Sequence, residues 1–142
     1  MPKSNDAYQI VWLVRRLFRA LAQRSNESLL ELGVSAADRA VLEFLYPEEK
    51  LSVPEIAERY QVSRQHVQIT VNDLLDSGLL AKRVNPRHKR SPLMALTDKG
   101  RTLFEKIRAQ DTNTVNQLFS KIPENDIHVT QKTLGSLLAM LK

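Results

Sequence analysis

Residues 63–77 carry long hydrogen-bonding side chains along one face of a predicted helix. The apolar residues of this segment recur at three- and four-residue spacing and form the stripe predicted to be buried: Val67, Val71, Leu74 and Leu75. The opposite face carries Ser63, Arg64, Gln65, His66, Gln68, Ile69 and Asn72. Arginine suits the acceptor pair of guanine, and glutamine or asparagine suits adenine. We therefore predict that this face contacts DNA, although a solvated helix surface would explain any one of these residues alone.

The charge of this segment changes along its length. Residues 63–72 contain no acid, and Asp73 and Asp76 come only near its end. Because the N-terminus of a helix is the positive end of its dipole, an acid-free start favours a nearby phosphate. Ile69 could contact a thymine methyl group or pack against another element, and packing is the preferred interpretation. This distribution of charge along the segment indicates a helix that enters a DNA groove by its N-terminal end.

A second cationic segment follows. Its basic residues fall in a stretch without acids: Lys82, Arg83, Arg87, Lys89 and Arg90. Short strands are predicted over 79–84 and 92–97, and the loop between them is longer than the roughly two to five residues of a usual hairpin connection. We expect this loop to project as a wing, with four residues that contact DNA: Arg87, His88, Lys89 and Arg90. A solvated surface loop is the alternative explanation of its charge.

Capping signals place the two segments beside each other. Ser52 and Glu55 form a capping box that starts a helix over 53–60. A turn of about three residues leads to Ser63, which caps the helix that Gly78 ends. Two short helices joined by so tight a turn must cross steeply, as in a helix-turn-helix. The order of cap, turn, acid-free helix and basic loop favours DNA binding over an unrelated set of surface features.

Longer helices are predicted before and after this region. The apolar positions from Asp6 to about Leu32 recur at helical spacing. Ser35 and Asp38 form a second capping box, and Pro47 stops the helix that it opens. A helix capped by Thr97 runs to about Ser120, and a last helix starts at Pro123; the residues predicted to face inward along the first of these are Leu103, Phe104, Ile107, Val115 and Leu118.

Composition limits the class of protein. A chain of 142 residues is too short for a (β/α)-barrel enzyme or a doubly wound dinucleotide-binding enzyme. With only four glycines and six prolines, the expected fold class is mainly α. There is no cysteine, and we expect neither a metal site nor a cofactor. No apolar run suits a membrane span or a signal sequence, so we expect a soluble cytoplasmic protein with no membrane partner.

The order of elements resembles the MarR family of winged helix-turn-helix transcriptional regulators, over essentially the whole chain. The residues that carry the resemblance are Leu51-Ser52, Glu55-Ile56-Ala57, Val62-Ser63, Leu74, Gly78-Leu79-Leu80 with Arg83, Asn85-Pro86-Arg87 and Leu96-Thr97-Asp98-Lys99-Gly100. The resemblance implies a three-helix core with a two-stranded wing, double-stranded DNA as the partner, repression rather than activation, and release from DNA by a small-molecule effector.

One position in the wing departs from the family pattern. The family usually has an Asp-x-Arg triplet in which the acid helps to fix the arginine, whereas this chain has His88-Lys89-Arg90. Arg90 is therefore expected to lack an orienting acid. His88 either contacts a phosphate when protonated or lies in solvent, and solvent is the preferred interpretation.

The resemblance also implies a homodimer held by the terminal helices. These helices carry more apolar surface than a small winged helix can cover, which favours a partner on independent grounds, with an intramolecular helical core as the alternative. The predicted dimerisation residues are Ile10, Leu13, Leu17, Leu134, Leu137, Leu138 and Leu141. The expected domains are a dimerisation helix over 1–34, a winged helix-turn-helix DNA-binding domain over 35–99 and dimerisation helices over 100–142. Two-fold symmetry predicts a pseudo-palindromic DNA site.

Two other classes of function fit the sequence less well. An enzyme is disfavoured because the histidines His66, His88 and His128 lie on unlike segments and no nucleophile or phosphate-loop motif occurs. A winged-helix module for protein contacts in a larger assembly would need neither the acid-free helix face nor the basic wing. The sequence thus predicts a dimeric, sequence-specific DNA-binding regulator that is not an enzyme.

Overall fold

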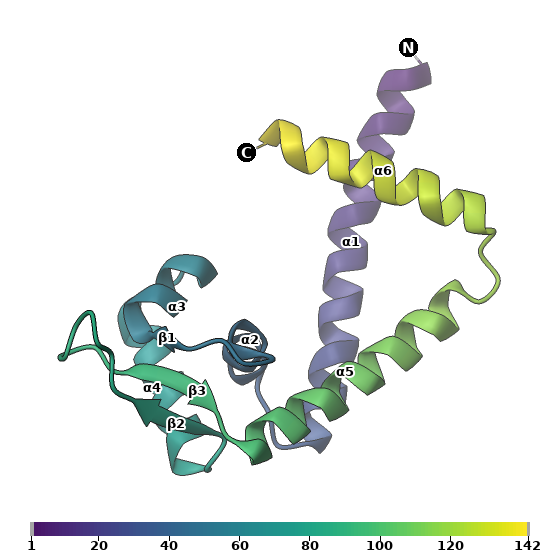
Figure 1. Ribbon diagram of the computed structural model, residues 1–142. Coiled ribbons are helices and arrows are strands. Elements are labelled where there is room, and N and C mark those ends of the chain that lie inside the picture. The colour runs from purple at the N-terminus through teal and green to yellow at the C-terminus, as the bar shows by residue number, and fades with distance from the viewer. Residues whose placement is uncertain (1, 142) are drawn as a thin grey trace. The chain divides into compact units, whose positions relative to one another are not determined.

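The computed structural model describes residues 2–141, with side chains from residue 4 onward. Helices dominate, and a short wing sheet interrupts them in the middle of the chain (Figure 1). The elements are α1 (Pro2–Glu31), α2 (Ala36–Leu45), β1 (Leu51–Ser52), α3 (Val53–Tyr60), α4 (Arg64–Asp76), β2 (Leu80–Arg83), β3 (Leu93–Leu96), α5 (Asp98–Phe119) and α6 (Glu124–Leu141). The predicted fold class, a mainly α winged helix-turn-helix with long terminal helices, is confirmed.

The chain forms two compact units, and the first ends at Ile107. It holds α1 to α4, the sheet and the first turns of α5, whereas the second holds the rest of α5 and α6. The helix α5 is continuous across the boundary. Within residues 2–141, none of the helices combines the length and the apolar character needed to cross a membrane.

Capping interactions define the helices next to the sheet. At the start of α2, Asp38 N donates to Ser35 Oγ over 3.0 Å, and Ser35 N donates to Asp38 Oδ2 over 3.1 Å. At the start of α3, Glu55 N donates to Ser52 Oγ over 3.4 Å, and Ser52 N donates to Glu55 Oε1 over 3.1 Å. Both predicted capping boxes are confirmed. The helix α2 ends before Pro47, as predicted, because a residue that precedes proline favours extended backbone.

The sheet contains a strand that the sequence pattern did not predict. Its order is β1-β3-β2, and both pairings are antiparallel. Leu51 pairs with Met94 and Ser52 with Leu93, so β1 joins the wing hairpin directly to the start of α3. Two residues are too few to show the alternation that marks a strand. The expected strand over 79–84 is also shorter than predicted, since Val84 lies beyond β2 and is 85% exposed.

The core of the first unit holds α4 in place. It includes the predicted stripe of α4 together with side chains from α2, α3, the sheet and α5: Val41, Leu42, Leu45, Ile56, Val67, Val71, Leu74, Met94, Phe104 and Ile107. Leu75 is half-buried at its edge. Because one face of α4 is buried in this way, its other face must point away from the core.

Part of the expectation for α5 is wrong within the single chain. Val115 and Leu118, predicted to face inward, are 51% and 45% exposed. No described residue of α6 is buried either. These residues lie in a unit of two helices, which is too small to enclose a core of its own.

Candidate nucleic-acid interface

The turn between α3 and α4 fixes the start of α4. Gln61 ends α3 in the left-handed region, with φ 59° and ψ 44°, a conformation uncommon for a residue with a side chain. The Oγ of Ser63 then accepts a hydrogen bond from His66 N over 3.0 Å and caps α4. The predicted helix-turn-helix and its cap at Ser63 are therefore present in the structure.

The face of α4 that points away from the core is exposed along its whole length. Every side chain predicted to contact DNA from this helix is exposed: Ser63, Arg64, Gln65, His66, Gln68, Ile69 and Asn72. Gln68 Nε2 donates to Asn72 Oδ1 over 2.9 Å, which aligns two amide groups one turn apart. Ile69 is 59% exposed, so the preferred packing interpretation is wrong within this chain. Its apolar surface instead lies on the same exposed face as the amides.

The wing is closed at its base by a residue that the sequence analysis did not single out for this role. Asn85 is buried, its Nδ2 donates to Ser91 O over 2.9 Å, and its Oδ1 accepts from Arg87 N over 3.1 Å. The Asn-Pro dipeptide is a known turn signal and could have identified this residue. All four side chains predicted to contact DNA from the wing are exposed: Arg87, His88, Lys89 and Arg90.

Arg90 stands in the unusual wing triplet His88-Lys89-Arg90. Within residues 4–141, its guanidinium makes neither an ion pair nor a hydrogen bond. The wing backbone is ordered by Asn85 instead, through one hydrogen bond that spans the loop to Ser91 and a second, local one from Arg87 N. Arg90 therefore keeps all its donors available for a ligand, at the cost of the side-chain entropy that ordering it would require.

The helix and wing residues line a common cavity. A cavity of about 450 Å³ lies between them, lined by Arg64, Gln65 and Gln68 of α4, Lys82 of β2 and Arg90 of the wing. The structure thus brings Arg64, Gln65 and Gln68 of α4 together with Arg90 of the wing, whereas the other residues predicted to contact DNA do not line this cavity. The predicted dimerisation residues lie elsewhere, on α1 and α6.

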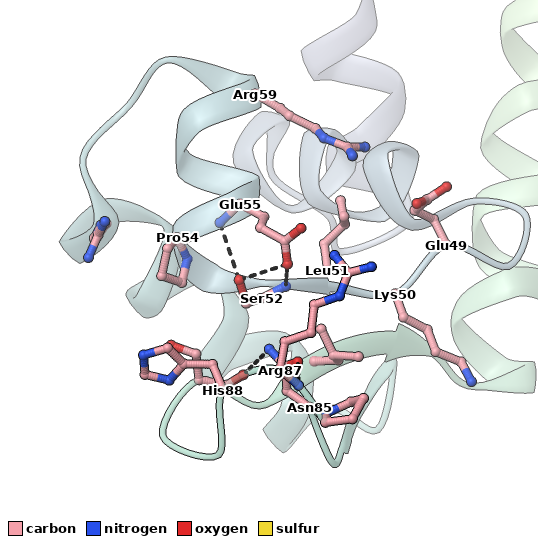
Figure 2. Close-up of a pocket in the computed structure, with 14 residues that line it drawn as sticks. Glu49, Lys50, Leu51, Ser52, Pro54, Glu55, Arg59, Asn85, Arg87 and His88 are labelled. Atoms are coloured by element: carbon pink, nitrogen blue, oxygen red, sulfur yellow. Dashed lines mark hydrogen bonds between the residues drawn. The ribbon is translucent and has the colours of Figure 1, made fainter.

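A larger cationic cavity lies between the start of α3 and the other side of the wing (Figure 2). It measures about 730 Å³, and three guanidinium groups and an imidazole line it: Arg59, Arg64, Arg87 and His88. Glu55 lies among them, and the hydrogen bonds from the Ser52 backbone and hydroxyl lower the pKa of its carboxyl, with a further contribution from the charges of Arg59 and Arg87. The cavity therefore has the excess positive charge that a backbone phosphate needs.

The lowered pKa of Glu55 predicts an acid-sensitive helix cap. A carboxyl whose pKa is lower in the folded chain contributes stability above its unfolded pKa, and this contribution is lost as the pH falls through the folded value. Glu55→Gln keeps a side-chain acceptor but does not titrate. We expect its free energy of unfolding to depend less on pH than that of the wild type below pH 4.5, the ordinary value for this carboxyl, in urea denaturation series. Glu58→Gln, exposed on the same helix, should behave as the wild type does. Equal acid sensitivity in Glu55→Gln and the wild type would contradict this account of the cap.

Several proteins to which this chain is similar are described as transcription regulators. A family model described as MarR family matches residues 32–91. An uncharacterised protein of Mycobacterium tuberculosis (strain ATCC 25618 / H37Rv) is 31% identical over 139 residues, which span 96% of this chain and 90% of that protein. The HTH-type transcriptional repressor MdtR of Bacillus subtilis (strain 168) is 29% identical, over 84% of this chain and 79% of the repressor. The crystal structure of the MarR family transcription regulator SP03579 matches with a TM-score of 0.91 at 24% identity, over 98% of this chain and 92% of that chain.

The family match covers the part of the chain that builds the interface. Residues 32–91 include α2, the helix-turn-helix of α3 and α4, and the basic wing. The resemblance inferred from the sequence motifs is therefore confirmed, and so is the expectation that the protein is not an enzyme, because members of this family regulate transcription by binding DNA. The chain belongs to the MarR family of transcriptional regulators, with a DNA-binding winged helix built from residues of α3, α4 and the wing.

Proposed function

We propose that this regulator is a homodimeric repressor that binds a pseudo-palindromic operator in cytoplasmic DNA. The observation that carries the proposal is the exposed polar face of α4 beside the cationic wing. In the proposed complex, α4 enters the groove by its acid-free N-terminal end, where its dipole favours phosphate. Its polar side chains meet base edges, and Arg87, His88, Lys89 and Arg90 of the wing meet the DNA backbone.

Exposed apolar side chains on the terminal helices support the homodimer. On α1, Ile10, Leu13 and Leu17 are 42%, 51% and 57% exposed. On α6, the corresponding exposed residues are Leu134, Leu137, Leu138 and Leu141. Exposed apolar side chains in such numbers on a helix usually mark a contact with another protein. The proposed domain division follows from these positions: dimerisation helices over 1–34 and 100–142, and a DNA-binding domain over 35–99.

The proposal assigns different roles to α4 and to the wing. Gln68→Ala or Arg64→Ala is expected to cost about 1 to 3 kcal/mol of binding free energy at particular base pairs, because each removes a contact to a base edge. Arg87→Ala or Arg90→Ala is expected to weaken binding to all duplexes by a similar factor, because a phosphate contact carries no sequence information. Anisotropy titrations against a panel of duplexes with single base-pair changes measure both effects.

Matched substitutions away from the interface serve as controls. Gln131→Ala on α6 and Arg24→Ala on α1 remove the same kinds of side chain from exposed positions outside the winged helix. Neither should change base preference. If the wing substitutions alter base preference and the α4 substitutions leave it untouched, the two roles are assigned the wrong way round.

A cavity beside the start of α5 supports an effector site in this proposal. It measures about 600 Å³, within the range of small-ligand sites. Its lining combines apolar side chains with two lysines and one aspartate: Leu32, Val34, Leu79, Leu103, Lys99, Lys106 and Asp98. We expect a small molecule bound there to lower the affinity for the operator. A ligand that occupies this cavity and leaves the affinity unchanged would count against the proposal.

A further inference from the structure

The motif Leu96-Thr97-Asp98-Lys99-Gly100 has a role that the DNA-facing surface does not explain. None of its residues lines either cavity beside the wing, within the part of the chain that the structure describes. Its contacts are made instead with the end of α4, the helix proposed to read base edges.

The end of α4 leaves three carbonyl groups without partners in the helix. Gly78 has φ 74°, its N–H donates to Leu75 O over 3.1 Å, and Leu79 N donates to Leu74 O over 2.9 Å. This is a Schellman motif, which satisfies carbonyls inside the last turn of the helix. The next carbonyls along the chain, those of residues 77–79, need donors from elsewhere.

The start of α5 supplies a donor to each of them. Lys99 Nζ donates to Ser77 O over 2.9 Å, and Thr97 Oγ1 donates to Gly78 O over 2.7 Å. The backbone N–H of Thr97 donates to Leu79 O over 3.1 Å. These three hydrogen bonds form what we term the carbonyl clamp. Because hydrogen bonds depend on angle, each of the three restricts the angle between α4 and the start of α5.

Two further features make the clamp rigid. The hydroxyl of Thr97 also accepts from Gly100 N over 3.1 Å, so one oxygen caps α5 and holds the end of α4 at the same time. Gly100 is buried against the Leu79 carbonyl, and a Cβ at this position would collide with that carbonyl oxygen. The glycine is therefore required by a close approach of two backbone segments.

A clamp at the end of α4 controls the position of its other end. From Ser77 to Gln65 the helix extends about 18 Å, so a tilt of about 5° at the clamp would displace Gln65 by roughly 1.5 Å. Such a displacement exceeds what the hydrogen bonds between a side chain and a base edge tolerate. Burial of Val67, Val71 and Leu74 holds α4 against the core, but apolar packing is non-directional and fixes this angle less tightly.

We propose that Thr97, Lys99 and Gly100 are positioning residues for base recognition. They set the orientation of α4 and thereby the sequence specificity of binding, without contact to DNA. The inference rests on the proposed role of α4 in reading bases. It predicts that loosening the clamp lowers the affinity for the preferred duplex and leaves the affinity for unrelated duplexes nearly unchanged, because the phosphate contacts tolerate a small tilt.

Two variants and two matched controls test this proposal. Thr97→Val removes the hydroxyl at constant shape, and Lys99→Met removes the ammonium at similar length. Thr97→Ser keeps the hydroxyl, and Lys132→Met removes one exposed cation from α6, away from the clamp. Affinity is measured at one salt concentration for a duplex selected by the wild-type chain from a random pool and for an unrelated duplex of equal length.

We expect Thr97→Val to weaken binding to the selected duplex about tenfold and Lys99→Met about threefold, with binding to the unrelated duplex changed less than about twofold. Thr97→Ser and Lys132→Met should match the wild type. The proposal would be overturned if folded variants, whose thermal unfolding lies above the assay temperature, lost equal affinity for both duplexes. It would also be overturned if both variants kept the specificity of the wild type. If Thr97→Val fails to fold, Lys99→Met still tests the proposal. The Lys99 side chain is exposed, so its substitution should leave the fold intact. A wild-type chain that does not discriminate between duplexes would instead contradict the proposed role of α4.

Discussion

Raising the salt concentration from about 50 to about 200 mM is expected to weaken binding to duplex DNA by about a thousandfold to ten-thousandfold. The exposed cations of the interface are expected to make about six to eight phosphate contacts per dimer, which gives a slope of about −5 to −7 in a plot of log affinity against log salt. The structure supports this number because Arg87, Lys89 and Arg90 of the wing and Lys82 of β2 are exposed in each chain. Titrations at several salt concentrations measure the slope.

Substitution of one wing cation should reduce this slope. Arg90→Ala removes one phosphate contact from each chain, so the slope should become shallower by about two for the dimer. Arg24→Ala, a change of equal charge on α1, should leave the slope unchanged. An affinity that does not vary between low and moderate salt would rule out phosphate binding by this surface.

A charge placed in the apolar stripe of α1 is expected to abolish tight operator binding. Leu17→Glu would bury a carboxylate in the proposed dimer interface, which is strongly unfavourable without a partner charge. Sedimentation should then show a monomer, and the affinity for the operator should fall by about a hundredfold or more, because two linked binding heads gain that factor over one. Leu17 is 57% exposed in the single chain, so the substitution should leave the fold of the chain intact.

The control for this variant is Gln23→Glu, which adds the same charge to the polar side of α1. It should remain dimeric and bind the operator as the wild type does. A Leu17→Glu variant that sediments as a dimer would show that the exposed stripe of α1 is not the interface. A monomeric variant that retains full affinity would show that dimerisation does not contribute to operator binding.

Local features of the fold could be predicted from the sequence because their partners are close in the chain. The capping boxes at Ser35 and Ser52 each join residues three positions apart, and so does the cap at Ser63. The apolar stripe of α4 follows from its helical period, and the core confirms it. The helix-turn-helix and the wing follow from these signals together with the charge pattern.

The features that could not be predicted depend on distant parts of the chain. The strand β1 has two residues and exists only because it pairs with β3. The exposure of Ile69 depends on the angle at which α4 packs, which its own sequence does not encode. The three hydrogen bonds of the clamp join residues 18, 19 and 22 positions apart and use backbone carbonyls, which carry no signal in side-chain identity.

The terminal helices show a further limit of predicting burial from the spacing of apolar residues. Their apolar spacing correctly predicts long amphipathic helices, but the same spacing suits an intramolecular core and an interface equally well. The spacing therefore predicts that Val115 and Leu118 face inward, whereas both are exposed in the single chain. Only the structure shows the difference along this helix. Phe104 and Ile107 are buried within the single chain, whereas Val115 and Leu118 are not.

Selection of bound duplexes from a random pool tests the central claim most directly: one rigid surface, formed by α4 and the wing, reads sequence on each half of a two-fold site. We predict enrichment of two inverted half-sites whose centres lie about ten base pairs apart, close to one turn of the double helix. Recovery of duplexes with no preferred bases, or with one preferred segment that lacks inverted symmetry, would contradict it.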